Sequence, residues 1–303
     1  MQQASKSPET GLMIAPLKDN FGAQIFDVDL QHADEALLQK VVRTFHAHGA
    51  IVLRNQTMEP DDLMRFIQAF GEPELHTQTK FCLPNYPHIF KISNMVDANG
   101  EPIGAHNDGL GWHTDYSYKE EPVMCTMLYA VTVPEEGGDT LLADQVAAYN
   151  DLPDDEKAFL DTLKIHHSLV HFIQNRDFNS YEITDELRRE NPDVIHPLVR
   201  VHPSDGRKAL WVSTGTVKHV LGMDDEEAMA LVERLVNYTT QPKYVYQHKW
   251  QKGDLLMWDN RCTLHTGTRY DDVKYQRMAH RLWVKGERPI AVDNSNVAER
   301  KVS

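Results

Sequence analysis

Helical patterns of apolar and polar residues occur in four stretches of the chain. The stretches are 33–47, 59–70, 153–163 and 224–238. Acidic residues fill the first turn of 59–70 and of 224–238, where they stabilise the partial positive charge of a helix N-terminus. Gly71 directly follows the second stretch and predicts the end of that helix.

Short and mostly apolar runs between these stretches predict β-strands. The runs cover residues 50–53, 123–133, 139–143, 255–258 and 277–284. A hairpin is expected from 199–202 and 209–212, because the turn sequence Pro203-Ser204-Asp205-Gly206 lies between them. The polar segments 92–110 and 178–192 are expected to form a loop and an insertion or lid.

The order of these elements indicates the fold class. Many short strands with interspersed helices lack the regular strand–helix alternation of a parallel α/β fold. We therefore expect a mostly β protein with flanking helices around a double-stranded β-helix, or jelly-roll, core. Residues 1–12 are expected to be a flexible N-terminus, 13–286 a single domain, and 287–303 a loose C-terminal tail.

Size and composition narrow the class of protein. A chain of 303 residues, 41% of them hydrophobic, is long enough to bury a substantial core. No run of 18 apolar residues predicts a membrane-spanning helix, and the N-terminus lacks the pattern of a signal peptide. Three widely spaced cysteines give no disulfide framework, so a cytoplasmic location is expected.

The formal net charge of −14 argues against binding to nucleic acid, which needs a basic surface. An acidic protein that binds a small anion must supply positive charge locally. Arg277 and Arg281 are four residues apart, so on one strand they would share a face with Cα atoms roughly 13 Å apart. Each arginine could then bind a different anion, because its planar guanidinium matches a carboxylate.

The pair His113 and Asp115 is the main candidate for chemistry. Residues two apart on an extended segment point to the same side, so both could reach one metal ion. His265, far downstream, could supply a third ligand. Two histidines and one carboxylate with open positions are typical of non-haem Fe(II) oxygenases, whereas a structural metal site is closed by four protein ligands.

The spacing of His113 and Asp115 is not specific by itself. The chain has 16 histidines, and a denser group contains His166, His167 and His171. His167 and His171 have no nearby carboxylate at strand spacing. We interpret them as surface residues or as residues that support a ligand from behind.

A series of motifs adds the missing context. The chain resembles the taurine dioxygenase and 2,4-dichlorophenoxyacetate dioxygenase family of Fe(II)- and 2-oxoglutarate-dependent oxygenases, from about Met13 to Val284. The resemblance implies a jelly-roll core in an oxygenase domain that uses Fe(II), 2-oxoglutarate and O₂. The motifs, in chain order, are Phe70-Gly71, Trp112-His113-Thr114-Asp115, Gly137-Gly138-Asp139-Thr140, residues 253–261 (GDLLMWDNR), His265 and Arg277-Met278-Ala279-His280-Arg281.

The resemblance also implies roles for single residues. His113, Asp115 and His265 match the family's iron ligands. Thr140 matches the hydroxyl that contacts the C5 carboxylate of 2-oxoglutarate, and Arg277 matches the arginine that pairs with it.

The resemblance leaves the substrate open. Arg281 matches an arginine that contacts the anionic group of the substrate in sulfonate-binding members, and His76 lies near their substrate-contacting histidine. Gly109 stands where those members carry an asparagine, which argues against taurine itself. The segments 89–97 and 258–262 are closer to the branch that cleaves aryloxyalkanoates.

The expected activity is hydroxylation of a small anionic organic substrate, with net cleavage where the new hydroxyl destabilises the product, and release of succinate and CO₂. The carboxylate at Asp115 favours hydroxylation, because related halogenases carry a small residue there. Alternatives are an aryloxyalkanoate-cleaving member, a non-catalytic cupin-like metal-binding module, and a zinc hydrolase. The expected partners are a small-molecule substrate and further copies of the chain in a dimer or tetramer, with no nucleic acid and no membrane.

Overall fold

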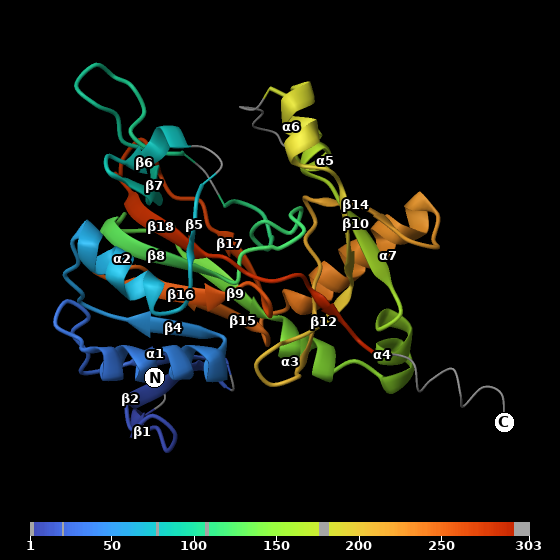
Figure 1. Ribbon diagram of the computed structural model, residues 1–303, viewed down its shortest axis with the longest axis horizontal. Coiled ribbons are helices and arrows are strands. Elements are labelled where there is room, and N and C mark those ends of the chain that lie inside the picture. The colour runs from blue at the N-terminus through green and yellow to red at the C-terminus, as the bar shows by residue number, and fades with distance from the viewer. Residues whose placement is uncertain (1–2, 20, 77–78, 107–108, 176–181, 294–303) are drawn as a thin grey trace.

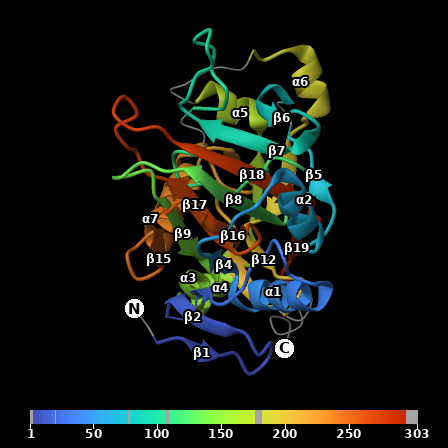
Figure 2. The ribbon, with the colours of Figure 1, turned by 90° about the vertical axis from the view of Figure 1, so that its left-hand side faces the viewer.

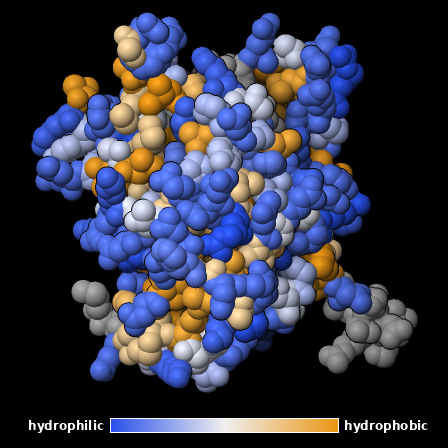
Figure 3. Space-filling view, turned by 60° about the vertical axis from the view of Figure 1, so that its left-hand side comes forward, coloured by the Kyte–Doolittle hydropathy of each residue, from blue (hydrophilic) through white to orange (hydrophobic). Residues whose placement is uncertain are grey.

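The computed structural model describes residues 3–19, 21–76, 79–106, 109–175 and 182–293. Figure 1 shows a sheet-rich body on the left and a smaller lobe on the right. Among the described residues, no helix has both the length and the apolar character needed to cross a bilayer. On the face in Figure 3, hydrophilic residues predominate and apolar residues form several separate groups.

One large mixed sheet forms most of the body. Its neighbouring strands are antiparallel except β3 and β4, which run parallel, and the central strands lie side by side in Figure 2. In spatial order the sheet contains β1 (Ser5–Lys6), β2 (Met13–Lys18), β3 (Phe21–Ile25), β4 (Ala50–Leu53), β16 (Leu255–Asp259), β8 (Cys125–Thr132), β18 (Met278–Val284), β7 (Tyr86–Ser93) and β6 (Cys82–Leu83), with β5 (Pro73–Glu74) paired to β18.

Two helices, α1 (Glu35–His48) and α2 (Pro60–Gln68), cover one face of this sheet. The Asp34 side chain accepts a hydrogen bond from the backbone N–H of Leu37, and Gly49 ends α1 with a φ of 72°, which suits glycine. The apolar stripe of each helix packs on the strands, with Phe45 of α1 and Phe66 of α2 in one core with Met257 of β16. Burial of these side chains fixes both helices on the sheet.

A second sheet faces the other side of the large sheet. It consists of β15 (Val245–His248), β9 (Thr140–Asp144) and β17 (Thr263–Gly267) in antiparallel order. Leu142 of β9 shares a buried core with Leu128 of β8 and Trp258 of β16. The two sheets therefore enclose apolar side chains between them.

The smaller lobe continues from this second sheet and has its own apolar core. Leu231 and Leu235 of its longest helix pack against strand residues such as Ile165. The lobe contains two three-stranded sheets, β11 (Val194–Pro197), β10 (Lys164–His167) and β14 (Val217–Val220), and β13 (Lys208–Leu210), β12 (Val199–Val201) and β19 (Ile290–Ala291), with α3 (Gln145–Asn150), α4 (Asp154–Leu160), α5 (Leu169–Gln174), α6 (Asp185–Glu190) and α7 (Asp225–Thr239). A short 3₁₀ turn, η1 (Thr79–Phe81), precedes β6.

Both chain ends contain a short paired strand. Ser5 and Lys6 pair with Ile14 and Met13, so β1 lies at an edge of the large sheet. In the tail 287–303, β19 pairs with β12, and residues 294–303 lie outside the described part. A polar sequence does not reveal backbone pairing with a distant strand, which is why both segments were expected to be loose. The domain boundaries 13–286 stay a prediction.

Candidate active site

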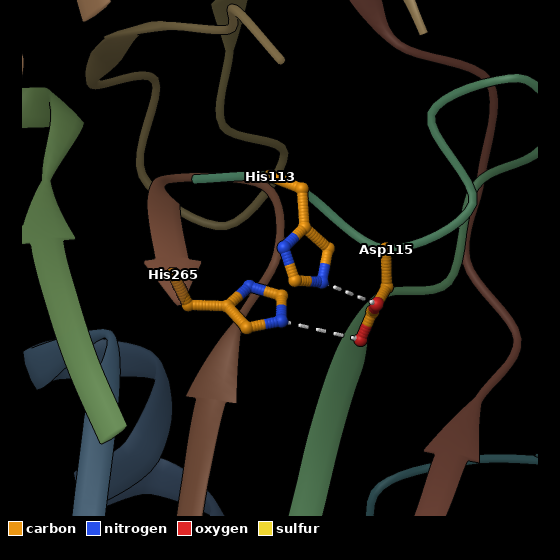
Figure 4. A group of neighbouring side chains, drawn as sticks. All are labelled: His113, Asp115 and His265. Atoms are coloured by element: carbon orange, nitrogen blue, oxygen red, sulfur yellow. Dashed lines mark ion pairs between the residues drawn. The ribbon is translucent and has the colours of Figure 1, made fainter. Parts of the chain in front are cut away.

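The structure brings His113 and His265 together as direct neighbours across an antiparallel bridge. The backbone N–H of each residue donates to the carbonyl oxygen of the other, both at 2.9 Å. His265 is the middle residue of β17, and His113 lies on the segment that pairs with it there. The ring centroids are 4.1 Å apart, and Figure 4 shows both imidazoles on the same side as Asp115.

The Asp115 carboxylate completes this group. Its Oδ1 lies 3.5 Å from Nε2 of His113, and its Oδ2 lies 3.7 Å from Nε2 of His265. The intervening Thr114 turns the other way, and its hydroxyl donates to the carbonyl of Thr263 at 3.2 Å. The expected alternation of the His113–Asp115 pair is therefore present, and all three ligand atoms lie within 4.8 Å of one another.

Hydrogen bonds orient two of these side chains. Nδ1 of His113 lies 2.7 Å from the carbonyl oxygen of Gly111, which can only accept, so Nδ1 carries a proton and Nε2 is the nitrogen that could bind a metal. Oδ2 of Asp115 accepts hydrogen bonds from the Thr126 hydroxyl at 2.5 Å and from Nε1 of Trp283 at 3.0 Å.

The electrostatics favour an ionised carboxylate. Burial raises the pKa of Asp115, but the charge of His265 and the hydrogen bond and charge of His113 lower it further than burial raises it. The resulting pKa lies well below the usual range of an aspartate. Two imidazole nitrogens and one carboxylate oxygen suit Fe(II), and three protein ligands leave positions open for other groups.

A cavity of about 700 Å³ opens beside these residues. His113 and Asp115 line it together with Arg281. The smaller lobe also lines the cavity, where α5 contributes Phe172 and α7 contributes Met229. The cavity therefore lies between the sheet-rich body and the lobe, and its volume is typical of a small-molecule site.

Arg281 and His76, both predicted to contact substrate, lie together in this cavity wall. A guanidinium N–H of Arg281 donates to Nε2 of His76 at 2.7 Å, so that nitrogen is an acceptor. The His76 ring stacks between Phe90 and Trp283, at 3.7 and 4.8 Å between centroids. Arg281 is only 7% exposed, so its charge is fixed in position at the cavity surface.

Arg277, predicted to bind the cosubstrate, lines a separate narrow cavity of about 30 Å³. A register irregularity follows Met278, so Arg277 precedes the regular part of β18. Leu110 lines this cavity and the larger one, so the two are adjacent. Burial lowers the pKa of Arg277, and the guanidinium has no ion pair within the described part of the chain. A buried cation without a counterion suits an anionic cosubstrate.

Thr140 starts β9 opposite Gly267, which lines the Arg277 cavity. Its hydroxyl accepts a hydrogen bond from Nε1 of Trp250 at 3.1 Å. The structure thus places Thr140 on the strand beside the Arg277 cavity, while its side chain is not part of the cavity wall.

The dense histidine group differs partly from its interpretation. His166 forms an ion pair with Asp193 at 3.2 Å. His171 lines the large cavity, and His167 is fully buried, so neither is a plain surface residue. The spacing of these histidines in the sequence does not show that His167 would be buried in the smaller lobe or that His171 would line the cavity.

A second group has ligand spacing but another role. His202, Asp259 and Cys262 lie close enough to share an ion. The guanidinium of Arg261 already donates to both oxygens of Asp259, at 2.8 and 2.6 Å, and Nε2 of His202 lies 3.0 Å from the same carboxylate. Burial raises the pKa of the Cys262 thiol far above its ordinary value, which disfavours the thiolate that a metal needs. This group is a buried ionic cluster.

The sequence interpretation missed the segment 213–216, a run of Ser213, Thr214, Gly215 and Thr216 that lines the cavity. It also missed the apolar wall formed by Tyr118, Phe172 and Met229. Four small residues directly after an apolar strand are a detectable signal for a loop. Nothing local indicates that this loop meets the segment that carries His113.

Comparison with known proteins identifies the family. Residues 13–283 match the family model described as "Taurine catabolism dioxygenase TauD, TfdA family". A 2,4-dichlorophenoxyacetate dioxygenase of Burkholderia sp. (strain RASC), named as alpha-ketoglutarate-dependent, is 33% identical over 280 residues, which are 88% of this chain and 92% of that protein. A sulfonate dioxygenase of Saccharomyces cerevisiae, also named as alpha-ketoglutarate-dependent, is 29% identical over 286 residues. The match covers 92% of this chain and 68% of that protein.

Solved structures agree with these matches. The crystal structure of AAD-2 in complex with Mn(II) and N-oxalylglycine has a TM-score of 0.78 and 30% sequence identity, over 92% of this chain and 99% of that one. A structure described as a taurine dioxygenase from Burkholderia xenovorans has a TM-score of 0.75 and 27% identity, over 92% of this chain and 93% of that one. The chain therefore belongs to the TauD, TfdA family of dioxygenases.

Proposed function

We propose that this chain hydroxylates a small anionic organic substrate at a metal ion held by His113, Asp115 and His265. The family reaction is that of a 2-oxoglutarate-dependent dioxygenase, which uses Fe(II), 2-oxoglutarate and O₂. One observation carries the proposal: the three ligand atoms lie within 4.8 Å of one another beside a cavity that a buried arginine also lines. When bound, the metal and the cosubstrate supply the oxidising power, while the protein supplies position and exclusion of side reactions.

The two arginines divide the binding of anions. Arg277, which has no ion pair among the described residues, would hold the far carboxylate of 2-oxoglutarate with help from Thr140 on the neighbouring strand. Arg281 would bind the anionic group of the substrate, because it lies in the wall of the larger cavity with His113 and Asp115. His76 keeps the Arg281 guanidinium in place through their 2.7 Å contact.

An aryloxyalkanoate is the favoured kind of substrate. Trp112, Phe172 and Trp283 give the cavity aromatic surfaces that suit an aryl ring. Relatives named for 2,4-dichlorophenoxyacetate and for (S)-phenoxypropionate are 33% and 30% identical to the chain. Hydroxylation of the carbon beside the ether oxygen would give a hemiacetal, which collapses to a phenol and a keto or aldehyde acid. A sulfonate is the second candidate, since a relative named for sulfonates is 29% identical.

The fold would follow the family's jelly roll. The large sheet and the β15–β9–β17 sheet would be its two sides, and the buried core of Leu128, Leu142 and Trp258 between them supports this arrangement. Assembly into a homodimer or homotetramer stays a prediction.

The test measures succinate formation and O₂ consumption with Fe(II), 2-oxoglutarate and a panel of aryloxyalkanoates, sulfonates and amino acids. We expect succinate to form in step with one of the acidic substrates. Asp115→Ala should abolish this activity, because the metal would lose its only carboxylate ligand.

Two results would contradict the proposal. Turnover that continues without oxygen would indicate a hydrolase, and a protein that binds metal but forms no succinate with any substrate would be a non-catalytic module. Asp154→Ala serves as the matched control, because Asp154 lies in α4 outside the walls of both cavities and its side chain is fully exposed. It should leave metal-dependent succinate formation in place.

A further inference from the structure

The segment that carries two of the proposed metal ligands has little backbone support of its own. Within the described residues, the backbone of 112–117 pairs with the core only at the bridge between His113 and His265. Tyr116 has a φ of 54°, which lies in the left-handed region and is uncommon for a residue other than glycine. Such a conformation persists only where the surroundings hold it.

Side-chain hydroxyls of residues 213–216, here named the hydroxyl loop, supply that support. They contact the ligand segment, residues 112–117, at three successive points. The contacts are a hydrogen bond from the Thr214 hydroxyl to the Trp112 carbonyl at 3.1 Å, one from the Thr114 backbone N–H to the Ser213 hydroxyl at 3.5 Å, and one between the hydroxyls of Ser117 and Thr216 at 2.7 Å.

The contact between Thr216 and Ser117 is the strongest of the three by distance and burial. Ser117 is 1% exposed and Thr216 is 5% exposed. A buried hydroxyl that loses its partner keeps the full cost of its lost hydration, so these two groups hold each other in place. The Ser213 contact is long, and Thr214 is exposed, so both add less.

The lobe anchors Thr216 from behind. Its backbone carbonyl accepts a hydrogen bond from the N–H of Ser168 at 2.9 Å, and its hydroxyl lies 2.9 Å from Nδ1 of His167 in β10. Nε2 of His167 is buried and has no partner in the described structure, so the ring proton is favoured on Nδ1. His167 then donates to Thr216, and Thr216 donates to Ser117.

The hydroxyl loop also forms part of the cavity wall. All four of its residues line the cavity, as does Phe172 of α5. Gly215 lies close to that ring, since a Cβ at this position would be 2.7 Å from Cδ2 of Phe172. A substrate that fills this end of the cavity would therefore contact the same residues that hold the ligand segment.

We propose that the hydroxyl loop, through Thr216, positions the ligand segment and transmits substrate occupancy of the cavity to the metal ligands. The proposal rests on the metal site proposed above. Thr216 and His167 are positioning residues, because they act on Asp115 through Ser117 and the backbone between them.

The test compares Thr216→Val, which keeps the shape but removes the hydroxyl, with Thr216→Ser, which restores it. Calorimetry with Mn(II) alone measures the metal site without turnover. We expect Thr216→Val to weaken Mn(II) binding about tenfold, the lower end of the range for residues that support metal ligands. Thr216→Ser should recover binding to within about twofold of the wild type, because its hydroxyl can make the same contacts.

The matched control is Thr44→Val, which removes another buried hydroxyl. Thr44 is 2% exposed in α1, and its hydroxyl donates to the Lys40 carbonyl. It should lower stability without changing Mn(II) affinity. Equal Mn(II) affinity in Thr216→Val and wild type would overturn the proposal, as would an equal loss in Thr44→Val.

A second measurement addresses the transmission of occupancy. With a substrate found in the panel above, the amount of succinate per hydroxylated product should rise in Thr216→Val and return in Thr216→Ser. An unchanged ratio would refute the transmission. Unchanged Mn(II) binding in Asp115→Ala would instead refute the proposed function. The two failures are therefore distinguishable.

Discussion

At the scale of single residues, the site is organised by the pairing of its buried charges. Asp115 is ionised between two imidazoles, and Arg281 donates to His76. Arg277 lacks an ion pair among the described residues, although burial makes its charge costly. A bound dicarboxylate would remove that cost, which explains why a cation is kept in so narrow a cavity.

Replacement of Arg277 should therefore affect the cosubstrate alone. In Arg277→Gln we expect the KM for 2-oxoglutarate to rise roughly 30-fold, which corresponds to about 2 kcal/mol for a lost hydrogen-bonded charge pair. Mn(II) affinity should stay unchanged, since Arg277 lies in a cavity separate from the metal ligands. Arg43→Gln, on the exposed face of α1, is the control for the loss of one positive charge. A parallel loss of Mn(II) affinity in Arg277→Gln would contradict this division.

At the scale of elements, the C-terminal segment closes the smaller lobe. Glu287 follows β18 and forms ion pairs with Arg200 at 2.9 Å and with Arg261 at 3.7 Å, before β19 pairs with β12. The Arg200 side chain is 2% exposed, so its charge depends on this carboxylate. The tail thus serves as a structural link between β18, which carries Arg281, and the lobe.

Loss of that link should destabilise the fold. Glu287→Gln should lower the free energy of unfolding by about 2 kcal/mol, because it weakens a hydrogen-bonded charge pair of the buried Arg200 with a partly exposed carboxylate. The control is Glu72→Gln, which removes an exposed ion pair with Lys285 and should cost less than about 1 kcal/mol. Denaturant unfolding of both variants measures the difference. Equal small effects would show that Arg200 is adequately solvated without Glu287.

The elements also show what the sequence can and cannot predict. Helices α1 and α7 and strands β4 and β16 are confirmed, because the helical spacing of apolar residues and the short continuous apolar runs are both local information. Strands β10 and β14 were not predicted, since their short sequences KIHH and VKHV mix histidine and lysine with apolar residues. The metal ligands could be proposed from spacing and motif order. The contact between Thr216 and Ser117 could not, because it joins residues 99 positions apart.

At the scale of the whole molecule, the large sheet and the smaller lobe each contain a histidine whose pKa burial lowers well below its ordinary value. Burial lowers the pKa of His167 in the lobe to about 3 and that of His280 in the large sheet to about 4. The unfolded chain binds protons at both positions below its ordinary histidine pKa of about 6.5, while the folded protein does not. Stability is therefore complete above pH 6.5 and decreases as the pH falls toward these lowered values.

His280 offers a direct test of this acid sensitivity, because it lies outside the cavity and next to Lys91 across the β7–β18 pair. In His280→Gln the side chain does not titrate, so the loss of stability between pH 7 and pH 5 should be smaller than in wild type by about 2 kcal/mol. Denaturant unfolding of the metal-free protein at both pH values measures it. The difference between the two proteins above pH 7 is the internal control and should not vary with pH. Parallel pH curves for variant and wild type would show that His280 is protonated in the folded state.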